Sequence, residues 1–210
     1  MRRLLGHYDD AEGILEELLL AHPNRSSLRA RIVTELARVH QDQGKLESAE
    51  SLAREVRAYY RLSLGEGSPQ AILSTDLLAD LLVAQGSLSD AMILQQEALD
   101  GLARIHGPKE APLAPSLGRL AEIHARSGNW PTAAPLFEQA RTLLSDPEAR
   151  QPDTYARLLG RHAEALLARG RAEDADPLIR EAYEVLLSAF GDGHPWVAEA
   201  RSRLEKAQHL

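Results

Sequence analysis

The sequence has no cysteine, few aromatic residues and no long hydrophobic run. The absence of cysteine excludes disulfides and thiolate chemistry. An aromatic content of 4% leaves little for the stacking surfaces that bind single-stranded nucleic acid. No apolar stretch approaches the ~20 residues of a membrane-spanning helix, and residues 1–6 are too short and too interrupted for a signal peptide. A formal net charge of −7 disfavours attraction to nucleic acid or to an anionic membrane. We therefore expect a cytoplasmic protein with neither of these partners.

Motifs for catalysis and for metal or nucleotide binding are also missing. The sequence has no His-Glu-x-x-His and no P-loop, and its Ser, His and Asp residues lie outside any nucleophile-elbow context. His40 and His124 fall at helical positions, where we expect them to pack half-buried, while His22 and His194 each precede a proline in a loop. We therefore expect no catalytic residue, no cofactor and no metal.

The two tryptophans follow turns. Trp130 comes directly after Gly128-Asn129, and Trp196 directly after His194-Pro195. Exposed tryptophans are frequent binding hot spots, but an aromatic residue at a turn between repeats more often packs against the next helix. We expect packing for both residues and leave the hot spot as the alternative.

Small residues recur at a fixed spacing of 42 residues. Each of four glycines follows an alanine by seven residues and precedes another alanine by five. The three columns are Ala37, Ala79, Ala121 and Ala163; Gly44, Gly86, Gly128 and Gly170; and Ala49, Ala91, Ala133 and Ala175. A period of 20 to 50 residues is typical of stacked-repeat proteins, which present an extended surface to other proteins and seldom carry an active site.

Each repeat is predicted to contain two helices. In the first repeat, apolar residues at helical spacing predict a helix over about 27–43 and another over about 46–64. Gly44 ends the first helix, and the turn residues of 65–69 predict a loop. Pro135 and Pro177 fall near the starts of second helices, where a missing N–H matters less.

We expect one repeat domain over residues 1–210. It comprises a half-repeat at 1–25, four repeats at about 26–68, 69–110, 111–151 and 152–195, and a terminal helix at 196–210. Gly6 and Ala11 have the same separation as Gly44 and Ala49, so residues 8–20 are predicted to form the second helix of a repeat. This pattern favours a fragment of a longer protein or a misassigned start.

The columns resemble the tetratricopeptide repeat, in the 42-residue form typical of kinesin light chains and many bacterial proteins. The first-helix pairs Leu36-Ala37, Leu78-Ala79 and Leu120-Ala121 match the family, and His162-Ala163 departs from it at the first position. The segment 191–195 resembles the family's loop between repeats. The resemblance covers nearly the whole chain. It implies an all-α, right-handed superhelical solenoid of antiparallel helix pairs, with about four full repeats and a half-repeat at each end.

In this family the first helices line a concave groove that holds a peptide. The groove positions implied here are Arg31, Thr34, Arg38, Asp76, Asp80, Glu122, Arg126, Arg157 and Glu164. One column among them, Arg38, Asp80, Glu122 and Glu164, keeps the 42-residue spacing and is mostly acidic, which favours a partner segment with basic residues. The alternative is a solvated face whose charges pair with neighbouring helices. The paired asparagines of kinesin light chains are absent, so we do not expect their mode of cargo recognition.

The resemblance implies a non-catalytic protein–protein interaction module that acts as a scaffold, adaptor or regulator. The alternative is the C-terminal sensor or regulatory region of a larger bacterial enzyme, such as a Ser/Thr protein kinase. A third reading is self-association through the N-terminal half-repeat.

Overall fold

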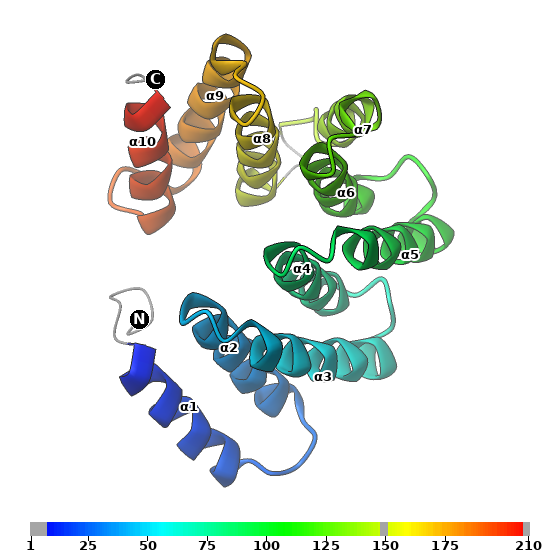
Figure 1. The fold of residues 1–210 in the computed structure, drawn as a ribbon, viewed down its shortest axis with the longest axis vertical. Coiled ribbons are helices and arrows are strands. Elements are labelled where there is room, and N and C mark those ends of the chain that lie inside the picture. The colour runs from blue at the N-terminus through cyan, green and yellow to red at the C-terminus, as the bar shows by residue number, and fades with distance from the viewer. Residues whose placement is uncertain (1–7, 148–150, 208–210) are drawn as a thin grey trace. The chain divides into compact units, whose positions relative to one another are not determined.

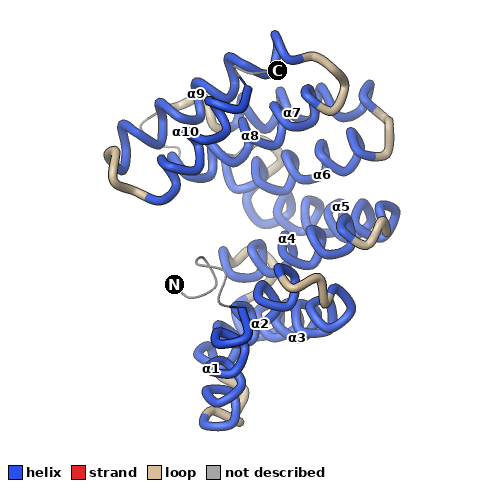
Figure 2. Tube along the Cα trace, turned by 60° about the vertical axis from the view of Figure 1, so that its left-hand side comes forward, coloured by secondary structure: helices blue, strands red, loops and turns tan. Residues whose placement is uncertain are grey.

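The computed structural model describes residues 8–147 and 151–207, and these residues form helices joined by short loops (Figures 1 and 2). Within the described residues there are ten α-helices, one short 3-10 helix and no strand. The all-α fold class is therefore confirmed. The elements are α1 (Tyr8–Ala21), α2 (Ser27–Asp42), α3 (Leu46–Leu64), α4 (Pro69–Ala84), α5 (Leu88–His106), η2 (Ala111–Leu113), α6 (Ala114–Arg126), α7 (Trp130–Leu143), α8 (Pro152–Leu167), α9 (Ala172–Phe190) and α10 (Pro195–Ala207).

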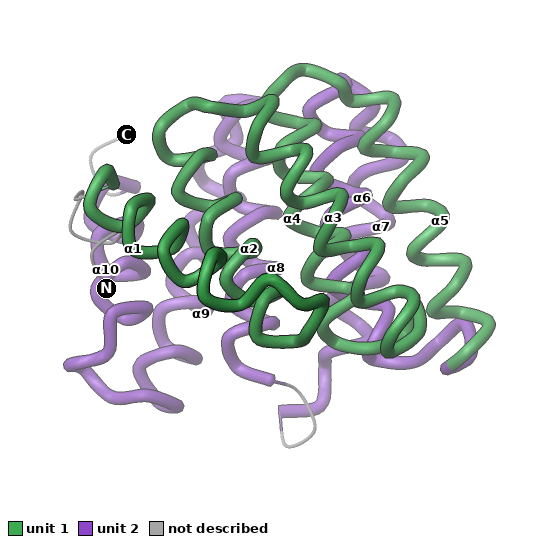
Figure 3. The backbone as a smooth tube through the Cα atoms, turned by 90° about the horizontal axis from the view of Figure 1, so that it is seen from below, with its two compact units in different colours: residues 1–105 green, residues 106–210 purple. Residues whose placement is uncertain are grey.

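The helices divide between two compact units, residues 1–105 and 106–210 (Figure 3). In unit 1, α1 packs on α2, α2 on α3, and α3 on α4. In unit 2, α6 packs on α7 and on α8, while α8 packs on α9 and α9 on α10. The structure divides into two compact units, and the single domain over residues 1–210 stays a prediction.

The predicted helix boundaries agree closely with the structure. The helix predicted over about 46–64 is α3, and the one predicted over about 27–43 is α2. Pro135 and Pro177 lie inside α7 and α9, near the start of each helix, and both helices continue past them. The 3.6-residue period of the apolar positions was therefore sufficient to locate the elements.

The repeated glycines end the first helices. Gly44, Gly86, Gly128 and Gly170 have φ angles of 75°, 80°, 82° and 71°. In each turn the amide after the glycine donates to a carbonyl five residues back, as from Lys45 N to His40 O at 2.8 Å. This left-handed stop satisfies carbonyls at the helix end, and a residue with a Cβ would adopt it only with strain.

The repeated alanines lie where the two helices of a pair meet. Ala37, Ala79 and Ala121 are 0% exposed and Ala163 is 1% exposed, and the four alanines of the second helices are also 0% exposed. Side chains of this size let the backbones of paired helices approach closely, which explains why both columns hold alanine in every repeat.

An aromatic cluster fills the core of unit 2 around His162. The His162 ring stacks on Phe137, with centroids 4.4 Å apart and planes at 7°, and Trp130 lies 6.1 Å from His162. The guanidinium of Arg169 covers Trp130 at 5.0 Å. Trp130 thus packs against the next helix, α8, as predicted. Burial lowers the pKa of His162 below 6.5, and Arg141 and Arg171 lower it further against the opposing charge of Glu138.

Replacing His162 with leucine is expected to flatten the pH dependence of unit 2. Because the folded pKa is lowered, the unfolded chain binds the proton more tightly, so stability is full above about pH 6.5 and falls as the pH drops towards the folded pKa. Leucine stands at this position in the other repeats, so the cost at pH 7 should stay below about 1.5 kcal/mol. Urea unfolding followed by tryptophan fluorescence between pH 7 and 5 measures both effects, with His106→Leu, at an exposed histidine, as the control. An unchanged pH slope in His162→Leu would contradict the assignment.

Trp196 differs from the prediction of helix packing. Its ring meets Phe190 at 5.2 Å edge-on and His194 at 4.8 Å, both at the loop between α9 and α10, and the side chain remains 45% exposed. Pro195 is the first residue of α10, so Trp196 lies in the first turn of this helix, next to the loop. His194 lies in this loop, as expected, and its Nδ1 accepts from the Trp196 amide at 3.2 Å.

Candidate functional site

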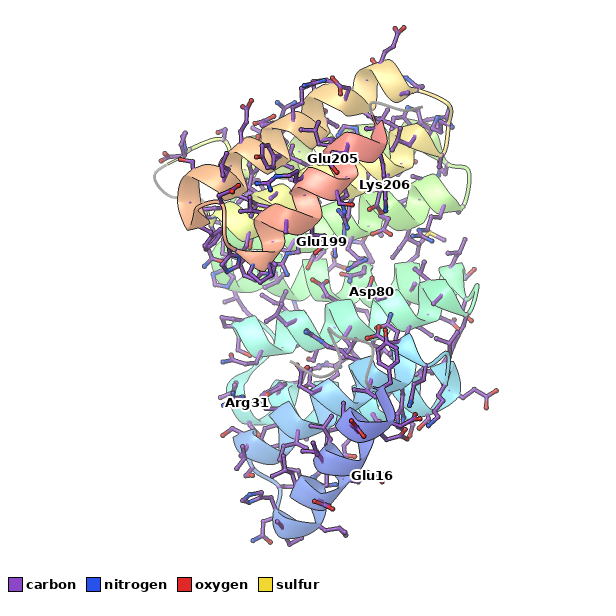
Figure 4. The ribbon with its side chains drawn as sticks, turned by 90° about the vertical axis from the view of Figure 1, so that its left-hand side faces the viewer. Glu16, Arg31, Asp80, Glu199, Glu205 and Lys206 are labelled. Atoms are coloured by element: carbon purple, nitrogen blue, oxygen red, sulfur yellow. The ribbon has the colours of Figure 1, made fainter. Side chains whose placement is uncertain are left out.

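The predicted groove positions lie on the first helices of both units. Figure 4 labels Arg31 of α2 and Asp80 of α4 in unit 1. The same figure labels Glu199, Glu205 and Lys206 of α10 in unit 2. We call the exposed sides of the first helices the first-helix face of each unit, taken separately: α2 and α4 in unit 1, and α6, α8 and α10 in unit 2.

In unit 1 the predicted residues are exposed or half-buried. Arg31 is exposed, and Arg38 pairs loosely with Glu35 at 3.8 Å with 40% of its side chain exposed. Thr34 donates to the Ala30 carbonyl at 2.8 Å, as a helical threonine usually does. These α2 side chains are accessible to a partner.

The two aspartates of α4 are less available. Asp76 accepts a 3.0 Å hydrogen bond from Nε2 of Gln95, a fully buried side chain of α5. Asp80 is half-buried and also has an interaction within the chain. Asp76 therefore satisfies a buried amide, a structural role that the sequence pattern did not indicate.

In unit 2 the acidic column is neutralised by arginines. Glu122 is only 8% exposed, and its carboxylate accepts from Arg119 at 2.9 Å, Arg126 at 3.1 Å and Arg161 at 3.2 Å. One repeat later, Glu164 pairs with Arg203 of α10 at 3.5 Å. In both cases an arginine of the next first helix reaches back to the glutamate.

These contacts form a repeated pattern, which we call the Arg–Glu ladder: Arg161–Glu122 and Arg203–Glu164. The two arginines are 42 residues apart and so are the two glutamates. Sequence reasoning missed the arginines, although their spacing was visible in the printed sequence. The ladder matches the alternative reading of this column, in which the charges pair with neighbouring helices, and both carboxylate oxygens of the buried Glu122 accept from arginines.

Glycines set the separation of the first helices in unit 2. A Cβ added at Gly118 of α6 would lie 2.6 Å from Leu158 Cδ1 of α8. A Cβ added at Gly160 of α8 would lie 2.9 Å from Nη1 of Arg203. These glycines are also 42 residues apart, and each directly precedes an arginine, Arg119 or Arg161, that contacts Glu122. Gly118 thus allows the close approach of α6 and α8, and Arg161 joins these two helices through its ion pair with Glu122.

The first helices of unit 2 carry more positive charge than its second helices. Side chains of Arg126, Arg157 and Glu164 are 54%, 52% and 56% exposed, and Arg203 is 49% exposed. Helices α6, α8 and α10 together hold seven Lys or Arg against five Asp or Glu, whereas α7 and α9 hold two against six. The first-helix face of unit 2 is therefore the more positive side.

Other kinds of site find no support in the described part of the chain. Residues 8–147 and 151–207 contain no group of three or more His, Asp or Glu placed to hold a metal ion. Among the same residues, no helix has the length and apolar character needed to cross a bilayer. A shallow hollow lies beside the start of α2, lined among others by Arg25, Arg29, Glu55 and Tyr59. Two of these lining residues, Arg29 and Glu55, pair with each other at 3.4 Å.

Comparison with known proteins agrees with this architecture. The tetratricopeptide repeat pattern matches residues 28–104 and again 116–151. Human tetratricopeptide repeat protein 23 is 29% identical over 177 residues, which are 82% of this chain and 39% of that protein. A clustered mitochondria protein homolog of Aspergillus oryzae is 25% identical over 177 residues, which are 84% of this chain and 14% of that protein. The chain thus spans well under half the length of these curated relatives.

A solved structure shares the fold. The crystal structure of a Podosopora anserina putative kinesin light chain with nearly identical TPR-like repeats matches with a TM-score of 0.57 and 22% identity, covering 86% of each chain. At this identity the likeness establishes the fold alone. Together with the buried alanine columns and the glycine turns, these matches confirm the predicted resemblance: the chain carries tetratricopeptide repeats in both of its compact units.

Proposed function

We propose that this chain is an interaction module that binds a segment of another protein on its first-helix face. Tetratricopeptide repeat proteins generally mediate protein–protein interaction, and the proposal assigns that role to particular helices. The observation that carries it is the set of exposed charged side chains on α6 and α8, namely Arg126, Arg157 and Glu164. They lie beside the buried ion pair between Arg119 and Glu122. Packed helices that present exposed charged side chains can bind an extended or helical peptide through complementary charges.

For unit 2 we propose a partner segment that carries carboxylates. Glu122, Asp153 and Glu164 on α6 and α8 pair with arginines, whereas the guanidinium groups of Arg126, Arg157 and Arg203 are about half exposed. Each of them can exchange a solvent-exposed internal carboxylate for one from a ligand at little cost, since exposed ion pairs contribute only about 0–1 kcal/mol. The acidic column predicted a partner rich in basic residues. In unit 2, Glu122 of this column is buried and paired, so fewer carboxylates are accessible to such a partner than the sequence indicated.

The choice of test residue follows from the ladder. Lysine at position 122 would face three arginines in a buried site and would unfold the unit rather than probe binding. Arg157 is better suited, because it is 52% exposed and, among the residues that the structure describes, it pairs with Asp153 at 3.2 Å and Thr154 at 3.3 Å on its own helix. Arg180 of the second helix α9 offers a matched control: it is 48% exposed and pairs with Asp176 four residues earlier at 2.7 Å.

Arg157→Glu is expected to abolish partner capture or weaken it about ten-fold, the effect of losing one charge-assisted hydrogen bond. The measurement is affinity capture from native lysate with mass spectrometry, followed by titration of each captured partner. Arg180→Glu makes the same charge change on a second helix and should bind as the parent does. Equal capture by all three proteins, or equal loss in both variants, would refute binding on the first-helix face.

A further inference from the structure

Helix α1 occupies the position of a second helix in unit 1. Gln43 at the end of α2 donates to Glu12 of α1 at 2.8 Å, and Gln85 at the end of α4 hydrogen-bonds Glu50 of α3. The two glutamines are 42 residues apart and the two glutamates 38. Positions in α1 therefore correspond to positions 38 residues later in α3. Hydrogen bonds from Lys45, and to a lesser extent from Gln43, lower the pKa of Glu12 to about 2. The ionised Glu12 carboxylate therefore joins α1 to the turn after α2.

In α3, one apolar stripe is covered by α2. Ala49 and Val56 are 0% and 1% exposed, and Leu52 packs against the cluster that contains Ala30 and Val33 of α2. At the edge of the same stripe, Glu55 pairs with Arg29, near the start of α2, at 3.4 Å. The covering helix thus supplies small and apolar residues along the stripe and a cation at its own N-terminal end.

The corresponding stripe of α1 is exposed. Its members are Ala11, Ile14 and Leu18, spaced at i, i+3 and i+7, and the side chains of Ile14 and Leu18 are 44% and 41% exposed. Glu17, which is exposed, corresponds to Glu55. The helix carries five acidic residues and no basic one along its 14 residues. A helix that packs on this stripe and pairs with Glu17 must therefore itself carry a basic residue.

We propose that this stripe binds an amphipathic helix of a partner protein, antiparallel to α1 as α2 is to α3. The partner helix places a Lys or Arg opposite Glu17, as Arg29 stands opposite Glu55. After this Lys or Arg, the partner helix carries small or apolar residues one, four and eight positions later, as α2 carries Ala30, Val33 and Ala37 after Arg29. This surface is distinct from the first-helix face.

The probe is a fluorescent peptide with the sequence of residues 26–43, titrated with the full 210-residue chain and followed by anisotropy. Leu18→Lys should weaken binding at least ten-fold, because it places a charge in the centre of the stripe. Leu20→Lys on the same helix is the control: Leu20 is 82% exposed and lies about 200° around the helix from Leu18, so binding should not change. Circular dichroism of both variants checks that helix content is retained.

The charge partner is tested by exchange. Glu17→Lys should weaken the parent peptide about five-fold, and a peptide carrying Arg29→Glu should restore binding to that variant but not to the parent chain. Absence of binding to the parent, or equal loss in Leu18→Lys and Leu20→Lys, would overturn the proposal. Sedimentation over a range of concentrations tests the other occupant: dimers lost in Leu18→Lys and kept in Leu20→Lys would assign the stripe to a second copy and overturn the partner-helix assignment.

Discussion

Replacing Glu122 with alanine is expected to lower the free energy of unfolding of unit 2 by about 3–5 kcal/mol, the usual cost of removing one partner from a buried ion pair. The variant leaves Arg119, whose side chain is 4% exposed, without the carboxylate that it contacts at 2.9 Å. It also removes the contact at 3.2 Å by which Arg161 ties α8 to α6. Urea unfolding is the measurement of choice, because urea carries no charge and does not screen the ion pairs. Both tryptophans of the chain lie in unit 2, so their fluorescence reports this unit alone.

The control for Glu122 stands one repeat later in the same column. Glu164 pairs with Arg203 at 3.5 Å, but its side chain is 56% exposed. Glu164→Ala should therefore cost less than about 1 kcal/mol, and the difference from the parent should shrink in added salt. Similar losses in the two variants would show that burial of Glu122 does not set its contribution.

The helix pairs were predictable because their causes are local in the sequence. Apolar residues at helical spacing mark α2 and α3, and Gly44 marks the turn between them by its left-handed conformation. The alanine columns were equally visible, because close packing of paired helices depends on the size of a single side chain.

The chemistry of the first-helix face was harder to predict. The column that contains Glu122 was visible as acidic, but its neutralisation depends on Arg161, a residue 39 positions away in sequence that reaches it only after the repeats stack. Asp76 similarly receives a hydrogen bond from buried Gln95 on α5. The charge of an exposed helix face can be read from one repeat, whereas its availability depends on how consecutive repeats pack.

Replacing Gly118 with leucine is expected to destabilise unit 2 by about 1–3 kcal/mol through overpacking. Even the first atom of the new side chain would fall 2.6 Å from Leu158 Cδ1, and Leu158 is 4% exposed, so it has little room to move. The loss should appear in spite of the gain of up to about 1 kcal/mol that accompanies removal of glycine from a helix interior. Urea unfolding monitored by the two tryptophans gives the value.

An alanine pair separates steric fit from helix propensity. Gly160→Ala brings its Cβ to 2.9 Å from the tip of Arg203, a half-exposed side chain that can swing away, so the propensity gain should stabilise the unit by about 0.5–1 kcal/mol. Gly118→Ala meets the buried Leu158 instead and should be less stable than Gly160→Ala by about 1–3 kcal/mol. Equal changes at the two positions would mean that α6 and α8 adjust freely, and that glycine at 118 is not required for their approach. If Gly118→Ala destabilises unit 2 and Gly160→Ala stabilises it, glycine is required for helix packing at position 118, whereas at position 160 it mainly lowers the helix propensity.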